Sequence, residues 1–250
     1  MIHFLLLMGA GFVAGAMNAM AGGGSFVTLP ALVFAGLPSV AANASSAVAL
    51  FPASLASTWA YRRDLSGIGT VSLRALLPVS LAGGALGAGL LLATPPERFD
   101  EILPWLLLLA SLTFAFGQRA GIALRRRIPT GPVMVLIVQF LLAIYGGYFG
   151  GAVGIMMMAA WSLLSTADVQ AMNPAKTVLV AAANAVAVLC FIAAREVWWK
   201  ETLAMLLAAA LGGYAGARLA RRLEPRRIRR GVILLTAVMT LAFFLRAAYA

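Results

Sequence analysis

The sequence has one cysteine, one histidine and only eight acidic residues in a chain of 250. The lone cysteine, Cys190, allows no disulfide within the chain, and the lone histidine, His3, excludes zinc motifs of the HExxH type. Nucleophile elbows of the type GxSxG and phosphate-binding loops of the type GxxxxGK[ST] are also missing from the sequence. We therefore expect no enzymatic activity, no ATP hydrolysis by this chain, no metal and no cofactor.

Charged residues are scarce, at 11% of the chain, whereas 62% of the residues are hydrophobic. The apolar residues come in ten runs, of which eight approach the ~20 residues that cross ~30 Å of hydrocarbon as a helix. This pattern predicts an all-α polytopic membrane protein with eight long transmembrane helices, two short segments and no large soluble core. The runs lie at about residues 4–21, 25–36, 40–61, 71–93, 101–118, 131–149, 151–165, 173–194, 199–217 and 231–249.

The two short runs, the second and the seventh, directly follow glycine clusters. The first cluster is Gly22–Gly24, and the second consists of Gly150, Gly151 and Gly154. In lipid every backbone N–H and C=O needs a partner, so a poorly helical break must pack against protein or line a wet cavity. These glycine-broken segments are therefore where we expect a transporter to hold its cargo.

The order of segments occurs twice along the chain. A long run, a glycine break, a short run and three long runs follow one another in each half, which predicts an internal repeat of five plus five segments. We expect residues 1–125 to form the first repeat of the transmembrane domain and residues 126–250 the second. At an offset of 130 residues the identical pairs are Gly24 and Gly154, Ala41 and Ala171, Asn43 and Asn173, and Val48 and Val178.

The formal net charge of +11 comes from arginines in loops, which the positive-inside rule explains without a nucleic-acid partner. The loops around Glu97–Glu101 and Arg195–Glu201 are acidic or balanced, so we expect them outside. With these sides fixed, the number of crossings requires both short segments to traverse the bilayer. The two halves then have opposite orientations, and both termini lie outside. The cytoplasmic loops hold Arg62, Arg63 and Arg74; Arg119, Arg125, Arg126 and Arg127; and seven arginines from Arg218 to Arg230.

Inverted repeats with interrupted helices predict a mechanism. The cargo site lies near the midplane between the halves, and rocking of one half against the other exposes it to each side in turn. Helix N-termini at the breaks supply N–H donors and a positive dipole end. We therefore expect a small anionic or strongly polar cargo.

The chain resembles a known family in both halves. The first half contains GFVAGAMNAMAGGGSFVTLPALVFAGLPSVAANASS followed by SLASTWAYRRDL, and the second contains YGGYFGGAVGIMMM and AMNPAKT. These segments resemble the two repeats of the sulfite exporter TauE/SafE family. The resemblance implies a multi-pass protein of the bacterial inner membrane that exports sulfite, sulfonates or related organosulfur anions. The sequence departs from the family pattern in its second half, which lacks a triple glycine.

The candidate substrate-binding residues are the glycine breaks and the polar residues beside them. Each has a structural alternative: Asn18 could bond a backbone group freed by the break, the glycines could allow close helix packing, and the polar residues after Pro38 could cap a helix. The candidates are Asn18, Gly22, Gly23, Gly24, Ser25, Asn43, Ser45, Ser46, Tyr148, Asn173, Lys176, Thr177 and Asn184.

Lys176 is the most informative of these candidates because it is one of two lysines and lies early in a membrane-length run. A charge inside a helix bundle costs about 2.5–3.5 kcal/mol on insertion scales, so it should face a partner or a cavity. A cargo anion is one such partner. Pairing with Asp168 or extension of the lysine to the interface is the alternative.

The acidic residues fall in loops or near segment ends, so no carboxylate or histidine relay for proton coupling is visible. Anion export from a cell with a negative interior is favoured by about 2.3 kcal/mol per charge per 100 mV, so we expect facilitated or potential-driven export. Two alternatives stay open: import of a sulfur-containing or other small anion, and a non-transporting membrane assembly subunit. The sequence does not indicate an oligomeric state.

The loop charges generate a prediction about orientation. In a variant lacking Cys190, a cysteine at Arg222 is expected to react with an impermeant thiol reagent only after the cells are opened. A cysteine at Glu97 is the matched control, and it is expected to react in intact cells. Labelling of position 222 from outside intact cells would contradict the ten-crossing arrangement.

Overall fold

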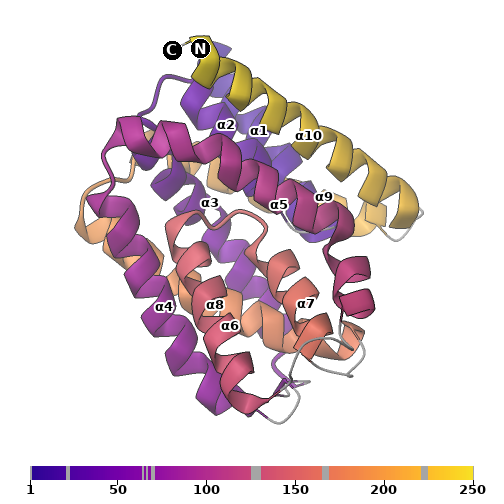
Figure 1. Ribbon diagram of the computed structural model, residues 1–250. Helices are drawn as coiled ribbons and strands as arrows, with labels where there is room; N and C mark the ends of the chain where they lie inside the picture. Colours follow the sequence, from indigo (N-terminus) through magenta and orange to yellow (C-terminus); the bar gives the residue numbers. More distant parts are fainter. Residues whose placement is uncertain are drawn as a thin grey trace.

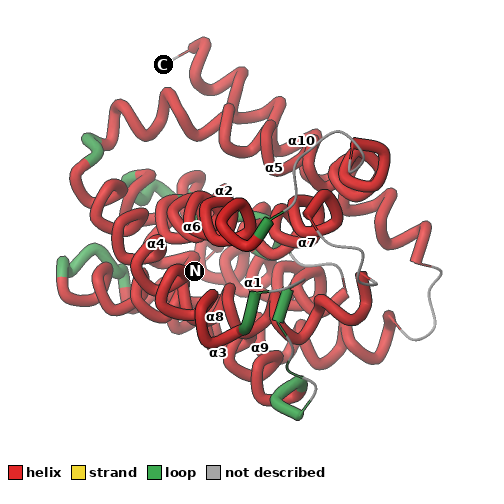
Figure 2. Tube along the Cα trace, turned by 60° about the horizontal axis from the view of Figure 1, so that its bottom comes forward, coloured by secondary structure: helices red, strands yellow, loops and turns green. Residues whose placement is uncertain are grey.

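The computed structural model describes residues 2–20, 23–63, 65, 67–68, 71–124, 131–164, 169–220 and 225–249. These residues form ten helices and, apart from one isolated bridge between Ile68 and Val71, no β-structure (Figure 2). The predicted all-α class is therefore confirmed. The helices are α1 (Ile2–Met20), α2 (Ser25–Phe34), α3 (Ser39–Ala60), α4 (Leu73–Ala93), α5 (Pro96–Leu124), α6 (Pro132–Tyr148), α7 (Val153–Leu164), α8 (Val169–Ala193), α9 (Trp199–Ala220) and α10 (Pro225–Tyr249).

The described helices fall into two length classes. Eight have 17 to 29 residues, whereas α2 has 10 and α7 has 12. Four helical stretches are both long and apolar enough to cross a membrane: Ser39–Trp59, Leu73–Ala93, Pro96–Gly117 and Met172–Ala193. At 1.5 Å per residue, α2 and α7 reach only about 15 and 18 Å, roughly half of the hydrocarbon thickness. The described helices α2 and α7 are therefore shorter than a full membrane span, and the expected crossing of the bilayer by both short segments stays a prediction.

The first short helix turns back along the helix before it. α1 ends at Met20, and Gly23 then takes a φ of +85°, a left-handed value that glycine adopts without strain. At the other end of α2, Phe34 packs against Phe243 of α10 with ring centroids 5.8 Å apart. Because the start of α1 and the end of α10 lie at the same end of the molecule, α2 returns toward the end at which α1 begins (Figure 1).

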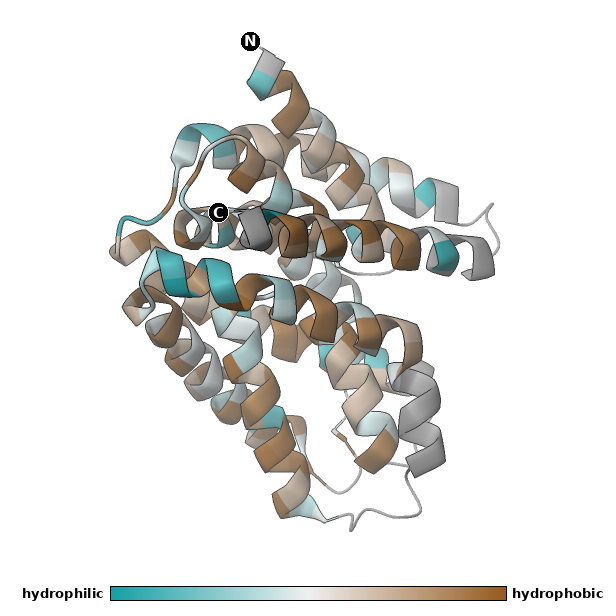
Figure 3. Ribbon diagram, turned by 45° about the horizontal axis from the view of Figure 1, so that its top comes forward, coloured by the Kyte–Doolittle hydropathy of each residue, from teal (hydrophilic) through white to brown (hydrophobic). Residues whose placement is uncertain are grey.

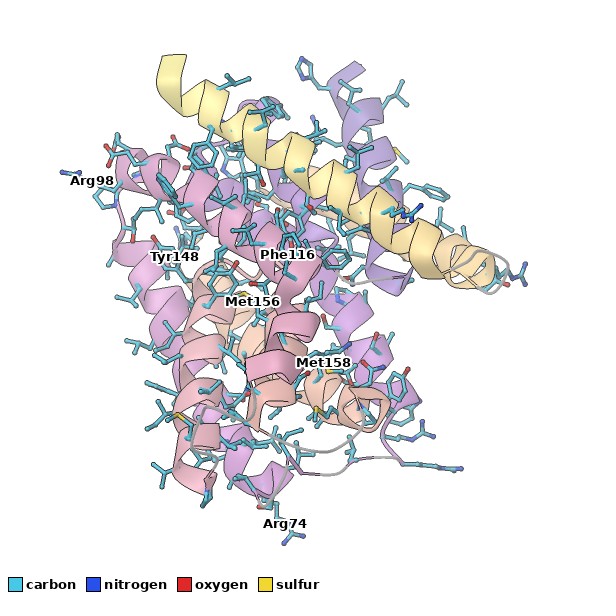
Figure 4. The ribbon with its side chains drawn as sticks, turned by 45° about the vertical axis from the view of Figure 1, so that its right-hand side comes forward. Arg74, Arg98, Phe116, Tyr148, Met156 and Met158 are labelled. Atoms are coloured by element: carbon cyan, nitrogen blue, oxygen red, sulfur yellow. The ribbon has the colours of Figure 1, made fainter. Side chains whose placement is uncertain are left out.

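The second short helix behaves in the same way. Gly150 has a φ of +73° between α6 and α7, and Leu164 at the end of α7 shares a buried cluster with Val135 near the start of α6. The two reversals are compatible with the alternation of sides that the loop arginines predict. Figure 4 accordingly places Arg74, near the start of α4, and Arg98, after its end, at opposite ends of the molecule.

Helices α3 and α8 pack against each other in opposite directions through the centre of the bundle. The Thr58 hydroxyl, late in α3, donates to the carbonyl of Thr177, early in α8, over 3.2 Å. At the other end, the N–H of Trp198, in the α8–α9 loop directly before α9, donates to the Ser45 hydroxyl over 3.0 Å. Residue numbers therefore rise along one helix as they fall along the other.

The helix contacts of the two halves correspond to each other. α1 packs on α9 and α6 packs on α4; α2 contacts α10 and α7 contacts α5; α3 contacts α9 and α8 contacts α4. If each helix of the first five is replaced by the helix five places later, and the reverse, the first contact of each couple becomes the second. The predicted boundary between the repeats, at 125 and 126, lies outside the described residues.

Two helix crossings in this series depend on glycine. A Cβ atom on Gly15 of α1 would overlap the carbonyl of Ala209 in α9, and one on Gly212 would overlap the carbonyl of Phe12. The same holds for Gly87 of α4 against the carbonyl of Ile144 in α6. Such close backbone approach through small residues is the usual means of helix association in membranes, where lipid removes most of the hydrophobic driving force.

Large apolar side chains cover much of the outside of the bundle, and Figure 3 shows hydrophobic residues along the lengths of the helices. Among the most exposed are Leu6, Trp105, Leu141, Leu207 and Leu211, each between 59% and 67% exposed. Exposed apolar surface on this scale would be unfavourable in water and is expected in contact with lipid. The described helices therefore form a multi-pass membrane bundle.

The glycine crossings generate a stability prediction. Gly87→Ala places a methyl group against the α6 backbone, so α4 and α6 must separate, at a cost of about 1–3 kcal/mol. We expect the melting temperature of the purified protein in detergent to fall by roughly 2–10 °C. Gly89→Ala, two residues along the same helix, has open space around its new Cβ and serves as the control. Equal melting temperatures for the two variants would contradict the close crossing.

Candidate functional site

A cavity of about 350 Å³ lies where the two helix breaks meet the central helices. Its walls come from the end of α1, the starts of α2 and α7, and one face each of α3 and α8. Along α3 the lining positions Ser46, Leu50, Ser54 and Ser57 span 11 residues, which is about 16 Å of helix. The cavity therefore extends along the antiparallel α3–α8 pair.

Both short helices begin at this cavity. Gly24 and Ser25 line it at the start of α2, and Val153 and Gly154 line it at the start of α7. The first backbone bonds of α2 run from the Phe26 N–H to the Gly23 carbonyl, 3.0 Å, and from later N–H groups to Gly24. Two helix N-termini, each with a positive dipole end, therefore lie at one cavity.

The structure brings most of the sequence-predicted site residues together. Nine of the thirteen candidates line the cavity, and they come from both halves of the chain. Gly22 lies outside the described residues. The nine are Asn18, Gly23, Gly24, Ser25, Ser46, Asn173, Lys176, Thr177 and Asn184. Their contact with cargo stays a prediction.

Three candidates do not line the cavity and instead tie helices together. The Asn43 amide donates to the Tyr148 carbonyl over 2.9 Å, and Ser45 accepts from the N–H of Trp198. The Tyr148 hydroxyl shares a 3.3 Å hydrogen bond with Thr94. Because Asn43 and Ser45 are only 2% and 0% exposed, these bonds join the first half of the chain to the second from within the bundle.

The capping alternative for the polar residues after Pro38 is wrong. α3 begins at Ser39 with Pro38 in the N-cap position, and no side chain caps it. Asn43, Ser45 and Ser46 therefore lie inside the helix, where their side chains bond to neighbouring helices. Ser46 shares a 2.6 Å hydrogen bond with the hydroxyl of Thr28 on α2.

Sequence reasoning missed two hydroxyl residues of the cavity, Ser54 and Ser57. They lie eight and eleven residues after Ser46, a spacing that returns to the same face of a helix. The signal was therefore present in the sequence. It was hidden because serines are common in this segment and nothing short of the packing distinguishes the inward face of α3 from the outward one.

The cavity is built from matching positions in the two halves. At the offset of 130 residues derived from the sequence, eight lining residues of the first half coincide with eight of the second. The pairs are Ala19 and Phe149, Gly23 and Val153, Gly24 and Gly154, Ser25 and Ile155, Ser46 and Lys176, Ala47 and Thr177, Leu50 and Val180, and Ser54 and Asn184.

Lys176 is the one charged residue among the described residues that line the cavity. Its aliphatic stem lies beside the first turn of α7, where a Cβ on Gly154 would sit 3.3 Å from the lysine Cδ. The ion pair that the described residues contain, Arg98 with Glu101, is on the surface and far from this helix in the sequence. The alternative partner, Asp168, lies outside the described residues.

The remaining lining groups suit an anion that accepts hydrogen bonds. Amides of Asn18, Asn173 and Asn184 and hydroxyls of serine and threonine line the same cavity as the lysine. Amides and hydroxyls can donate hydrogen bonds, but the hydroxyls of Ser57 and Thr177 already donate to backbone carbonyls of their own helices. The described lining residues include no carboxylate that would repel a negative charge. Within the described part of the chain, no three His, Cys, Asp or Glu side chains gather as metal ligands would.

Comparison with known proteins places this geometry in context. The profile of the family described as sulfite exporter TauE/SafE matches residues 7–243. A probable membrane transporter protein of Haemophilus influenzae is 28% identical over 239 residues, which cover 94% of this chain and 92% of the relative. The probable membrane transporter protein ORF9 of Sinorhizobium sp is 29% identical, with 96% and 92% covered, and YfcA of Escherichia coli is 28% identical, with 96% and 87% covered. No solved structure matches the chain at a significant level.

The cavity generates a prediction about hydration. In a background without Cys190, Ser54→Cys is expected to react with a water-soluble, charged methanethiosulfonate, because a wet cavity allows the reactive thiolate to form. Leu55→Cys is the control, since Leu55 is the next residue, is 48% exposed and faces outward toward lipid. Mass spectrometry of the purified variants measures the modified fraction. An unreactive position 54 beside a reactive position 55 would show that the cavity is dry.

Proposed function

The chain belongs to the sulfite exporter TauE/SafE family of membrane transporters, and from this premise we propose that it exports small organosulfur anions, such as sulfite or sulfonates. The proposed location is the bacterial inner membrane. The observation that carries the proposal is the cavity between the helix breaks, whose described lining has one cation, many hydrogen-bond donors and no carboxylate.

Lys176 is the proposed anchor for the anion. Its stem lies beside the first turn of α7, so its ammonium shares a neighbourhood with the positive end of that helix. Two positive groups in a cavity of low dielectric repel each other, and an anion between them relieves that repulsion. Amide and hydroxyl groups that line the same cavity can contribute to the shell of an oxyanion, whose oxygens accept several hydrogen bonds.

We also propose that the halves form an inverted repeat that works by alternating access. The antiparallel α3–α8 pair and the eight matched cavity positions support a two-fold relation between the halves. Hydrogen bonds join α3 to the other half at both ends. Asn43 bonds to Tyr148 at the buried end, whereas Asn173 donates to the exposed Tyr61 hydroxyl over 3.2 Å at the other. If one half rocks against the other, the hydrogen bonds at one end of α3 would break while those at the other end remain.

Export driven by the membrane potential fits the composition of the site. A negative interior favours outward movement of an anion by about 2.3 kcal/mol per charge per 100 mV. A proton-coupled cycle needs a group that changes its charge during transport, and the described lining residues contain no carboxylate and no histidine. We therefore expect flux to persist when the pH gradient is clamped at a fixed voltage.

The decisive experiment compares lysine variants in proteoliposomes loaded with labelled sulfite or a sulfonate. Lys176→Met keeps the aliphatic stem against Gly154 but removes the charge, and loss of a charged hydrogen bond costs about 1.5–3 kcal/mol. Flux is expected to fall roughly 10- to 100-fold. Lys176→Arg is expected to retain more flux than the methionine variant, because it keeps the positive charge.

Lys200→Met is the matched control, because Lys200 is the other lysine of the chain and lies exposed at the start of α9. Its flux should equal that of the wild type at equal protein abundance. Normal flux in Lys176→Met would remove the lysine from the cargo site. Inert wild-type vesicles together with a stable co-purifying protein would instead favour the role of an assembly subunit.

A further inference from the structure

The matched cavity positions differ in charge at one place. Of the eight pairs related by the offset of 130 residues, seven are uncharged on both sides, and the eighth pairs Ser46 on α3 with Lys176 on α8. The site thus has a nearly symmetric frame with its full positive charge on one wall. This asymmetry bears on how many negative charges the cargo carries.

The two members of this pair have similar surroundings. Lys176 lies beside the first turn of α7, through the close approach of its stem to Gly154. Ser46 lies beside the first turn of α2, through its 2.6 Å hydrogen bond to Thr28. Each side chain therefore occupies the place where a short helix begins and a central helix passes. Ser46 lines the cavity but is only 1% exposed, so the ammonium of a lysine at position 46 must extend past the Thr28 hydroxyl to reach the space that Lys176 faces.

A cavity with a single cation favours a single negative charge. Away from bulk water, a charge without a counter-charge is disfavoured, whereas a paired and hydrogen-bonded charge is tolerated. The two helix N-termini carry partial charges that assist either kind of anion. A second full charge on the cargo would find no full charge opposite it among the described lining residues.

Resting on the proposed function, we propose that the pair Ser46 and Lys176 sets the charge number of the cargo, so that the protein selects singly charged oxyanions over doubly charged ones. The anionic group binds on the α8 wall beside Lys176. The uncharged remainder of the cargo faces α3, where Ser46, Leu50 and Ser54 offer two hydroxyls and one short apolar surface. Monoanionic organosulfonates with a small substituent match this division, as does sulfite in its singly charged form, hydrogensulfite, whereas sulfate and fully deprotonated sulfite do not.

The experiment measures proteoliposome flux of methanesulfonate and of sulfate, with the membrane potential clamped at zero so that voltage does not bias the comparison. The wild type is expected to prefer methanesulfonate at least about tenfold. Ser46→Lys, which retains Lys176, is expected to raise the ratio of sulfate to methanesulfonate flux by about tenfold, because two cations then face the cargo.

A charge transplant provides the second arm. Lys176→Ser is expected to lose methanesulfonate flux, and the double variant Lys176→Ser with Ser46→Lys is expected to recover it to within about threefold of the wild type. A lysine that served only to hold helices or to pair with Asp168 could not be rescued from the opposite wall. Recovery by the transplant therefore separates a charge role from a structural one.

Folding is checked with two further variants. Ser46→Met removes the same hydrogen bond to Thr28 without adding charge, so it reports the structural cost of changing this position. Ser54→Lys adds a cation at another matched position on α3 and is expected to raise sulfate flux as well. It keeps the test open if Ser46→Lys fails to fold.

The outcomes distinguish the two proposals. A wild type that carries neither anion refutes the proposed function itself. A wild type that carries methanesulfonate while folded Ser46→Lys and Ser54→Lys proteins keep the wild-type ratio of sulfate to methanesulfonate overturns the inference about charge number alone. Equal wild-type transport of the two anions would overturn it as well.

Discussion

The need to satisfy every backbone hydrogen bond away from water governs this structure. A helix break inside a bilayer is tolerated only where protein or water can reach the freed groups. The breaks before α2 and α7 lie at one cavity in the middle of the bundle, with donors and hydroxyls around them. The constraint that makes a break costly in lipid thus also places two helix N-termini where a solute can meet them.

Close helix crossings hold the breaks in position. Glycines on α1, α4 and α9 bring backbones into contact, and the four helices of these crossings flank the central α3–α8 pair on both sides. Buried bonds such as the one from Asn43 to the Tyr148 carbonyl then join the two halves of the chain. Since apolar burial gives little preference for one helix neighbour over another in lipid, contacts of shape and hydrogen bonding must specify the arrangement.

The small number of charges at the site has the same physical cause as the scarcity of helix breaks. A full charge inside a membrane bundle is costly, so one lysine in a cavity otherwise lined by neutral groups is a strong constraint on what can bind. Because the other matched positions are uncharged in both halves, the charge of Lys176 is the main difference between the two walls of the cavity. In this protein the fold supplies the breaks and the cavity, and a single side chain supplies the charge.

The sequence by itself determined the helical membrane class, the ten segments and nine of the residues that meet at the cavity. It could do so because span length, glycine clusters and rare polar residues are local signals. Only the tertiary structure decided that α2 and α7 turn back, that Asn43, Ser45 and Tyr148 tie helices together, and that Ser54 and Ser57 face inward. Those outcomes depend on which neighbour each helix meets, because every face of a helix in lipid is apolar and periodicity no longer marks the inward side.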